Sequence, residues 1–257
     1  MRTLKLTIAY DGTSYAGWQV QVARRHGARD KGRKPTVQGT LERVFGQILQ
    51  EPVKVIGSGR TDAGVHALAQ VAHVKTRSSI SRQRLLRSLN ALLPKDIAVT
   101  RLEETDTAFH ARFDAARKRY RYRIFTGTVP PPFIRLYVHH VRVPLRVAAM
   151  RRELATLRGR HDFRAFARAP ERGRTTVRAV SDARLIRRGS ELNLELAGNG
   201  FLHTMVRSIA GTLIDVGRGR LPQGTVRRML KTRDRRLAGT TAPPQGLTLV
   251  SVEYRHG

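Results

Sequence analysis

One short segment of the sequence carries a carboxylate in a setting suited to chemistry. The segment SGRTDAGVHALAQVAHV, residues 58–74, turns through Gly59 and Gly64 and then continues as a strand. Glycines on both sides let the backbone turn tightly, which brings Arg60 and Asp62 to the rim. Asp62 is therefore a candidate catalytic carboxylate, a nucleophile or a base. The alternative is ordinary turn chemistry, in which the aspartate accepts hydrogen bonds from nearby backbone amides.

A second segment, FHARFDAARKRYRYRIF at residues 109–125, combines aromatic and basic residues. Strand alternation separates them into an apolar face and an arginine face. The apolar face holds Tyr120, Tyr122 and Ile124, and the arginine face holds Arg119, Arg121 and Arg123. We expect the arginine face to meet phosphate, Tyr122 and Ile124 to lie in the core, and Tyr120 to line a pocket. The alternative for Tyr120 is core packing, the commoner place of an aromatic stripe.

A third segment, GNGFLHTMVRSIAGTLIDVGRG at residues 198–219, has the apolar spacing of a helix. Its apolar stripe contains Phe201, Met205, Ile209 and Leu213. Arg207 lies two residues off this stripe, and we expect it to point into a cleft. A buried arginine requires a carboxylate partner. The alternative is a solvated helix face, the usual place of an arginine.

Charge and composition limit the partners of the protein. The chain has 49 basic and 19 acidic residues, a net charge of +30 spread along its whole length. A polyanion such as a nucleic acid is the expected partner, ahead of an anionic small molecule or a membrane surface. Cysteine is absent, which excludes disulfides, thiolate metal sites and a cysteine nucleophile. Without a signal peptide or a long apolar span, the sequence predicts a soluble cytoplasmic protein.

Periodicity predicts the elements that position these residues. In the first half we expect strands at 4–10, 53–57, 68–75 and 97–103, and helices from Thr36 and near Ser81. In the second half we expect strands at 117–126, 176–187, 191–198 and 247–254, and helices at 145–158, 201–216 and after Pro222. This β-α-β-β-α-β order, met twice, predicts an α+β fold of two ferredoxin-like halves, 1–106 and 107–257. Adjoining antiparallel sheets and a central basic cleft would hold the site.

Two basic segments fall outside this plan. Residues 22–35 (VARRHGARDKGRKP) and 167–176 (ARAPERGRTT) are polar and glycine-containing. Each is expected to be a loop, either a solvated linker or a direct contact with the nucleic acid.

The three chemical segments, taken with three further blocks, resemble the tRNA pseudouridine synthase A family. The further blocks are YDGTSYAGWQ (10–19), TVQGTLE (36–42) and APPQGLTLVSVEY (242–254). All occur in the family's order, and GRTDAGVHA is the most restrictive. The resemblance implies that the protein converts uridines at tRNA positions 38 to 40 to pseudouridine. It also implies that the protein uses no cofactor or metal and that it binds tRNA and no membrane. The protein would form a homodimer with a basic cleft.

Residue by residue, the resemblance makes Asp62 the catalytic aspartate and Arg207 its partner. Tyr120 would stack on the target uracil, and Arg60 would help hold the flipped-out nucleotide. The chain departs from the family pattern in a longer basic loop at 22–35 and in a C-terminus that stops soon after the last strand.

The implied reaction breaks the bond from N1 to C1′ and rejoins the uracil through C5, so the base must leave the stack. Asp62 could attack C1′ as a nucleophile or remove the C2′ proton to give a glycal, and both routes need its ionised form. A nearby arginine favours that form. Tyr120 could accept the C5 proton in the last step.

Two other classes of protein fit the sequence less well. A non-catalytic RNA-recognition module would need an aromatic RNP strand, which the sequence lacks. A metal-dependent nuclease would need converging carboxylates, and the one tight acidic cluster is Glu103, Glu104 and Asp106. The histidines have no ligand spacing, and His139 and His140 would point to opposite faces of a strand.

Overall fold

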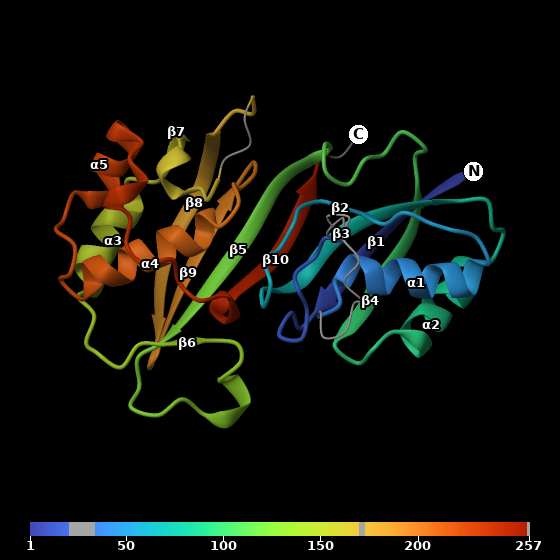
Figure 1. Ribbon diagram of the computed structural model, residues 1–257, viewed down its shortest axis with the longest axis horizontal. Coiled ribbons are helices and arrows are strands. Elements are labelled where there is room, and N and C mark those ends of the chain that lie inside the picture. Colours follow the sequence, from blue (N-terminus) through green and yellow to red (C-terminus); the bar gives the residue numbers. More distant parts are fainter. Residues whose placement is uncertain (21–33, 170–172, 256–257) are drawn as a thin grey trace, which may run out of the picture. The chain divides into compact units, whose positions relative to one another are not determined.

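The computed structural model describes residues 1–20, 34–169 and 173–255. These residues form a mixed α+β structure with ten strands and five α-helices (Figure 1). The chain divides into two compact units, of which the first comprises Met1–Ala116 and Leu249–Gly257 and the second Arg117–Thr248. The last strand therefore begins in the second unit and ends in the first.

The sheet of the first unit is built around β3. Its strands are β1 (Arg2–Tyr10), β2 (Ile56–Gly57), β3 (His66–Thr76), β4 (Ile97–Thr105) and the end of β10 (Leu247–Tyr254). β1 pairs antiparallel with β3 and β4, β2 pairs antiparallel with β3, and β10 also neighbours β3. Because β1 and β2 both run opposite to β3, they are parallel to each other with β3 between them. The predicted order β-α-β-β-α-β is confirmed here.

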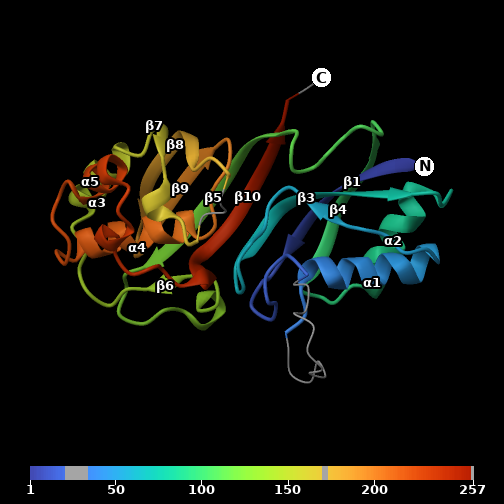
Figure 2. The same ribbon diagram turned by 45° about the horizontal axis from the view of Figure 1, so that its top comes forward.

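Two capped helices cover this sheet. α1 (Val37–Leu49) begins where the Thr36 hydroxyl accepts the Gly39 N–H at 3.1 Å, and α2 (Arg82–Leu92) follows the N-cap Ser81. Both helix starts were predicted, and such a cap contributes about 1 kcal/mol. The helices lie side by side on the sheet (Figures 1 and 2). Between the layers lie fully buried Leu4, Leu6, Ile8, Leu41, Phe45, Leu85 and Leu89.

The strand predicted at 53–57 is reduced to Ile56–Gly57. The reason is that side chains of α1 form hydrogen bonds with the backbone groups that a longer strand would use for sheet pairing. The N–H of Val55 donates to the Glu42 carboxylate at 3.0 Å, and its carbonyl accepts the Gln38 amide at 3.1 Å.

The second unit has a sheet in the order β5-β9-β8-β7, with β6 beside β5. The strands are β5 (Ala115–Phe125), β6 (His139–His140), β7 (Gly159–Asp162), β8 (Val177–Arg188) and β9 (Glu191–Gly198). Helices α3 (Val147–Ala155), α4 (Met205–Gly217) and α5 (Thr225–Thr232) pack together beside this sheet (Figure 2). β6 is the pair His139–His140, which we expected to lie on a strand, and β7 was not predicted because a strand of four residues gives no clear alternation.

Helix α4 begins later than the predicted start at residue 201. Thr204 has a left-handed φ of +61°, and the N–H of Met205 donates to the Leu202 carbonyl at 3.1 Å. Residues 201–204 therefore form a turn that leads into the helix. Apolar spacing alone does not reveal this turn, since Phe201 continues the stripe in phase.

Candidate active site

Asp62 lies in the turn between β2 and β3, residues 58–65, here called the Asp62 turn. The N–H of Val65 donates to the Asp62 carbonyl at 3.1 Å. Gly64 has a φ of +76°, a left-handed conformation that glycine adopts without steric cost. Arg60 is exposed and Asp62 partly exposed. Both side chains are therefore accessible to a large substrate, as the glycine pattern predicted.

Buried groups of β1 and the following segment hold the Asp62 turn in place. The hydroxyls of Tyr10 and Thr61 are hydrogen-bonded at 2.8 Å, and the Trp18 N–H donates to the Thr61 carbonyl at 3.0 Å. Burial raises the pKa of Tyr10 well above its ordinary value, so the phenol stays neutral. The residue next to Asp62 is thus fixed through both its side chain and its backbone.

A second set of polar contacts comes from β3 itself. The Ser58 hydroxyl donates to the Gln70 side-chain carbonyl at 2.7 Å, and the Gln70 amide donates to the Gly59 carbonyl at 2.9 Å. His66 Nδ1 accepts the Gly12 N–H at 3.1 Å. These positioning residues were not predicted from the sequence. The available signal was that His66 and Gln70 are polar residues within a strand whose other members are mostly apolar.

Tyr120 lies at the apolar face of β5, as predicted. Tyr120 is 7% exposed, while Tyr122 and Ile124 are fully buried. The Tyr122 hydroxyl donates to the Pro243 carbonyl at 2.8 Å, which fits its predicted place in the core. The ring of Tyr120 meets Phe201 edge to face, with the centroids 5.1 Å apart. Tyr120 is therefore positioned against the turn that leads into α4.

Arg207 lies in the first turn of α4 and is partly buried. Its Nε donates to the Ala242 carbonyl at 2.9 Å, and the Ala242 N–H donates to the Arg207 carbonyl at 3.1 Å. One turn later, a Cβ on Gly211 would lie only 1.7 Å from the Thr240 carbonyl oxygen. The segment 240–242 therefore lies directly against α4 and orients the guanidinium. Arg207 is not part of a simply solvated helix face.

The arginine face of β5 forms ion pairs. The pairs are Arg119 with Asp182 (3.4 Å), Arg121 with Glu195 (2.9 Å) and Arg123 with Glu191 (2.8 Å). The strand register explains this, because Arg121 lies directly opposite Glu195 in the β5–β9 ladder. Desolvation alone would raise the pKa of Asp182, but its contacts with Arg184 and Arg119 lower that pKa below the ordinary value. In the structure this face pairs with carboxylates of β8 and β9, and the phosphate contact stays a prediction.

The predicted site residues divide between the two units. Arg60 and Asp62 belong to the first unit, and Tyr120 and Arg207 belong to the second. Of the basic segment 22–35, only residues 34 and 35 lie within the described residues. The segment 167–176 is described except for residues 170–172.

In the described ranges, no three His, Cys, Asp or Glu side chains are arranged to hold a metal ion. The acidic cluster Glu103, Glu104 and Asp106 is included in this finding. Among the same residues, no helix combines the length and apolar character that crossing a membrane requires.

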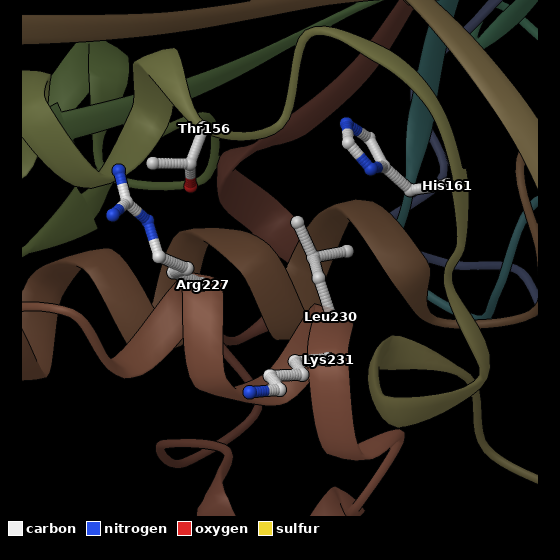
Figure 3. A pocket seen from close by; sticks show the side chains of 5 residues that line it. All are labelled: Thr156, His161, Arg227, Leu230 and Lys231. Carbon is white, nitrogen blue, oxygen red and sulfur yellow. The ribbon is translucent and has the colours of Figure 1, made fainter.

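A pocket of about 410 Å³ lies in the second unit (Figure 3). It is lined by Thr156, His161, Arg227, Leu230 and Lys231. Three of these come from α5, and none is a carboxylate. The lining therefore lacks the group that the predicted chemistry requires.

Comparison with known proteins gives one consistent answer. The sequence profile described as tRNA pseudouridine synthase matches residues 6–114 and 154–255. Relatives called tRNA pseudouridine synthase A include one from an Exiguobacterium species, 43% identical over 99% of this chain and 98% of its own length. Another, from Moorella thermoacetica, is 44% identical over 99% and 100%. A third, from Chloroflexus aurantiacus, is 45% identical over 100% and 90%.

Among solved structures, a chain in the crystal structure of a Cbf5-Nop10-Gar1 complex has a TM-score of 0.39 and 10% identity, covering 96% of this chain and 48% of that one. This likeness is too weak to carry an argument. The sequence matches span nearly the whole chain and include the Asp62 turn. The chain belongs to the tRNA pseudouridine synthase family, and it is an isomerase.

Proposed function

We propose that the protein isomerises uridine to pseudouridine at positions 38 to 40 of tRNA, in the anticodon arm. The observation that carries this proposal is the family match, which includes both the Asp62 turn and helix α4. The relatives named above are called tRNA pseudouridine synthase A over almost their full length. The net charge of +30 suits a polyanionic substrate.

Asp62 is the proposed catalytic carboxylate. The reaction breaks the bond from N1 to C1′ and forms a bond from C5 to C1′, after which the C5 proton must leave. The carboxylate either attacks C1′ as N1 leaves and forms an ester that C5 of the turned uracil displaces, or removes the C2′ proton as N1 leaves and gives a glycal. In the second route the carboxyl group returns the proton to C2′ when C5 bonds to C1′. Its accessible position in a braced turn supports this role, because a reacting group must be both reachable and held in place.

The proposed partners of Asp62 come from the second unit. Arg207 would favour the ionised carboxylate, and its bond to Ala242 helps to hold the guanidinium in place. Tyr120 would stack on the flipped uracil and accept the C5 proton. Arg60, in the same turn as Asp62, would hold the backbone of the flipped nucleotide. Tyr120 lies between the two matched ranges of the family profile, so its role rests on the sequence resemblance.

We further propose two ferredoxin-like halves flanking a central basic cleft. Residues 1–106 would carry the aspartate, and residues 107–257 the tyrosine and arginine. The parallel β1 and β2 with β3 between them support this architecture in the first unit. We also propose that the protein is cytoplasmic, since the absence of cysteine fits a reducing compartment. From the family resemblance we propose that it is a homodimer. A particle mass equal to that of one 28.9 kDa chain would refute the dimer.

The first test replaces Asp62 by asparagine, which keeps the shape of the side chain and removes the anion. Asp62→Asn should abolish pseudouridine formation in tRNA, measured in excess chelator, while circular dichroism and tRNA affinity stay unchanged. The control is Asp106→Asn, a change of an exposed aspartate in the same unit, which should keep full activity. Turnover by Asp62→Asn within tenfold of the unsubstituted protein would refute the assignment.

The second test addresses Arg207. Arg207→Ala should lower kcat and move the pH–rate profile toward alkaline pH, because the carboxylate loses the cation that favours its charged form. Arg207→Lys should rescue only part of the rate, since an ammonium cannot reproduce the two-pronged guanidinium contact. Arg228→Ala, at an exposed position of α5, is the control. A normal rate and pH profile in Arg207→Ala would show that the electrostatic role is wrong.

A further inference from the structure

The loop before β5 exposes a large aromatic ring that no step of the proposed reaction uses. Phe113 is 75% exposed. Its ring stacks on His110 with the centroids 4.2 Å apart and the planes at 28°, and His110 meets His73 at 4.9 Å. His73 is only 3% exposed. The three rings thus form a chain of contacts from the interior of the first unit to its surface, edge to face between His73 and His110 and stacked between His110 and Phe113.

Hydrogen bonds hold this loop in a single conformation. His73 Nδ1 accepts the Ala111 N–H at 3.1 Å, and the Tyr254 hydroxyl donates to the Ala111 carbonyl at 2.7 Å. Ala111 itself is fully buried. His110 Nδ1 accepts the backbone N–H groups of Arg112 and Phe113 at 3.2 and 3.3 Å. The backbone that carries the exposed ring is therefore held by hydrogen bonds, which lowers the conformational entropy lost on binding.

An aromatic ring with a cation beside it suits a nucleic acid as the partner. The Arg112 guanidinium lies 5.9 Å from the centre of the ring, and Arg112 is exposed. The loop also carries two carboxylates, which keep their negative charge: Asp114 accepts the His110 N–H at 2.7 Å, and Asp106 accepts the Ala108 N–H at 2.7 Å. An aromatic ring stacks on any base, while an adjacent cation binds phosphate.

We propose that His110, Arg112 and Phe113, here called the Phe113 platform, stack an unpaired base of the tRNA. One face of the Phe113 ring is covered by His110. The base takes the other face, and the exposed Arg112 side chain, which lies over the ring in the free protein, turns to the phosphate. This inference rests on the proposed function, because it requires an RNA substrate. It adds a positioning contact to the groups proposed to react.

The base on the Phe113 platform is not the reacting uridine. The Asp62 turn ends at Val65, next to the start of β3, whereas the ring contacts begin at His73 on the same strand. Seven residues of strand from His66 to His73 span roughly 23 Å. One nucleotide cannot reach both places, so the platform holds a second part of the same RNA.

The test compares side chains that differ in stacking ability. Phe113→Ala and Phe113→Leu should both weaken tRNA affinity roughly 5- to 150-fold, the loss expected for one base–aromatic stack. Phe113→Trp should keep the affinity. Phe133, 91% exposed in the second unit, supplies the matched controls: Phe133→Ala and Phe133→Leu should bind tRNA normally.

Fluorescence provides a direct readout of stacking. The chain has a single tryptophan, Trp18, which is 3% exposed. Emission from the new indole in Phe113→Trp should be quenched by tRNA, beyond any change seen in the unsubstituted protein. No quenching, or unchanged affinity in Phe113→Ala, would overturn the proposal.

A protein contact would give a different pattern. If Phe113 instead met a second copy of this chain, Phe113→Leu would keep tRNA affinity and Phe113→Ala would change the particle mass, and the proposal would be wrong. Pseudouridine formation by the unsubstituted protein is measured in parallel. Its absence would contradict the proposed function, whereas normal formation with unchanged affinity in Phe113→Ala would contradict the Phe113 platform alone.

Discussion

The segment 109–125 contains two aromatic regions that the structure uses in opposite ways. In its loop half, Phe113 projects into solvent beside exposed Arg112. In its strand half, the tyrosines are buried and the arginines pair with carboxylates of β8 and β9. The strand half carries four arginines and a lysine, and the loop half one arginine and one aspartate, but only the loop half offers an aromatic surface to a partner.

The difference shows that charge alone does not locate an RNA contact. Arginines on a strand meet whatever the neighbouring strands place opposite them, and here the neighbours supply Glu191 and Glu195. A large part of the positive charge on β5 therefore stabilises the sheet. A braced and exposed ring is more informative, because water does not favour its exposure.

The largest effect expected from this comparison concerns His73, on which the loop half rests. Burial, helped by the positive charges of His110 and Lys75 and opposed by Asp114, lowers the pKa of His73 to about 4. The unfolded chain then binds more protons than the folded one between about pH 6.5 and 4. Stability is therefore full above that window and falls as the pH drops through it, by roughly 3 kcal/mol in all.

Urea unfolding at pH 7 and pH 5 measures this effect. His73→Gln keeps an acceptor for the Ala111 N–H but does not titrate, so the unsubstituted protein should lose about 2 kcal/mol more than this variant between the two pH values. His203→Gln, at an exposed position of the second unit, should behave like the unsubstituted protein. Equal losses in all three proteins would show that His73 does not support the loop in its neutral form.

A smaller effect is expected from the strand half. Replacing Arg119, Arg121 and Arg123 by glutamine should lower the free energy of unfolding by roughly 1 to 2 kcal/mol, because partly exposed ion pairs contribute little each. The affinity of this triple variant for tRNA should fall no more than the affinity of a control variant in which three exposed arginines elsewhere in the unit are replaced by glutamine. Suitable controls are Arg142, Arg188 and Arg228, each changed to glutamine.

One outcome of the urea and binding measurements would remove the contrast between loop and strand. In that outcome the β5 triple variant unfolds at the same urea concentration as the unsubstituted protein but binds tRNA more weakly than the control triple. The arginine face of β5 would then serve RNA after all.

Local signals in the sequence predicted much of the fold. Thr36 and Ser81 precede apolar residues at helical spacing, and both cap helices. Alternation correctly assigned Tyr122 and Ile124 to the core of β5. The glycine pattern correctly predicted that Asp62 and Arg60 lie in a turn between strands. These features depend on neighbours within a few positions of the chain.

Features set by distant partners were not predictable in the same way. The pairing of Arg121 with Glu195 depends on the register between β5 and β9, which no local pattern specifies. No local sequence pattern distinguishes Phe113 from a buried aromatic residue, and only the fold shows that it is exposed. The bracing of the Asp62 turn by Tyr10 and Gln70 likewise joins residues that are far apart in sequence.

The tight contact between Gly211 and the Thr240 carbonyl has a genetic consequence. Any side chain at position 211 would push the 240–242 segment away from α4, and with it the carbonyl of Ala242 that orients Arg207. Gly211 is itself buried within the helix. Substitutions at this position would impair the enzyme although each residue of the proposed site is unchanged. A screen for conditional mutants would therefore identify position 211 in addition to the proposed site residues.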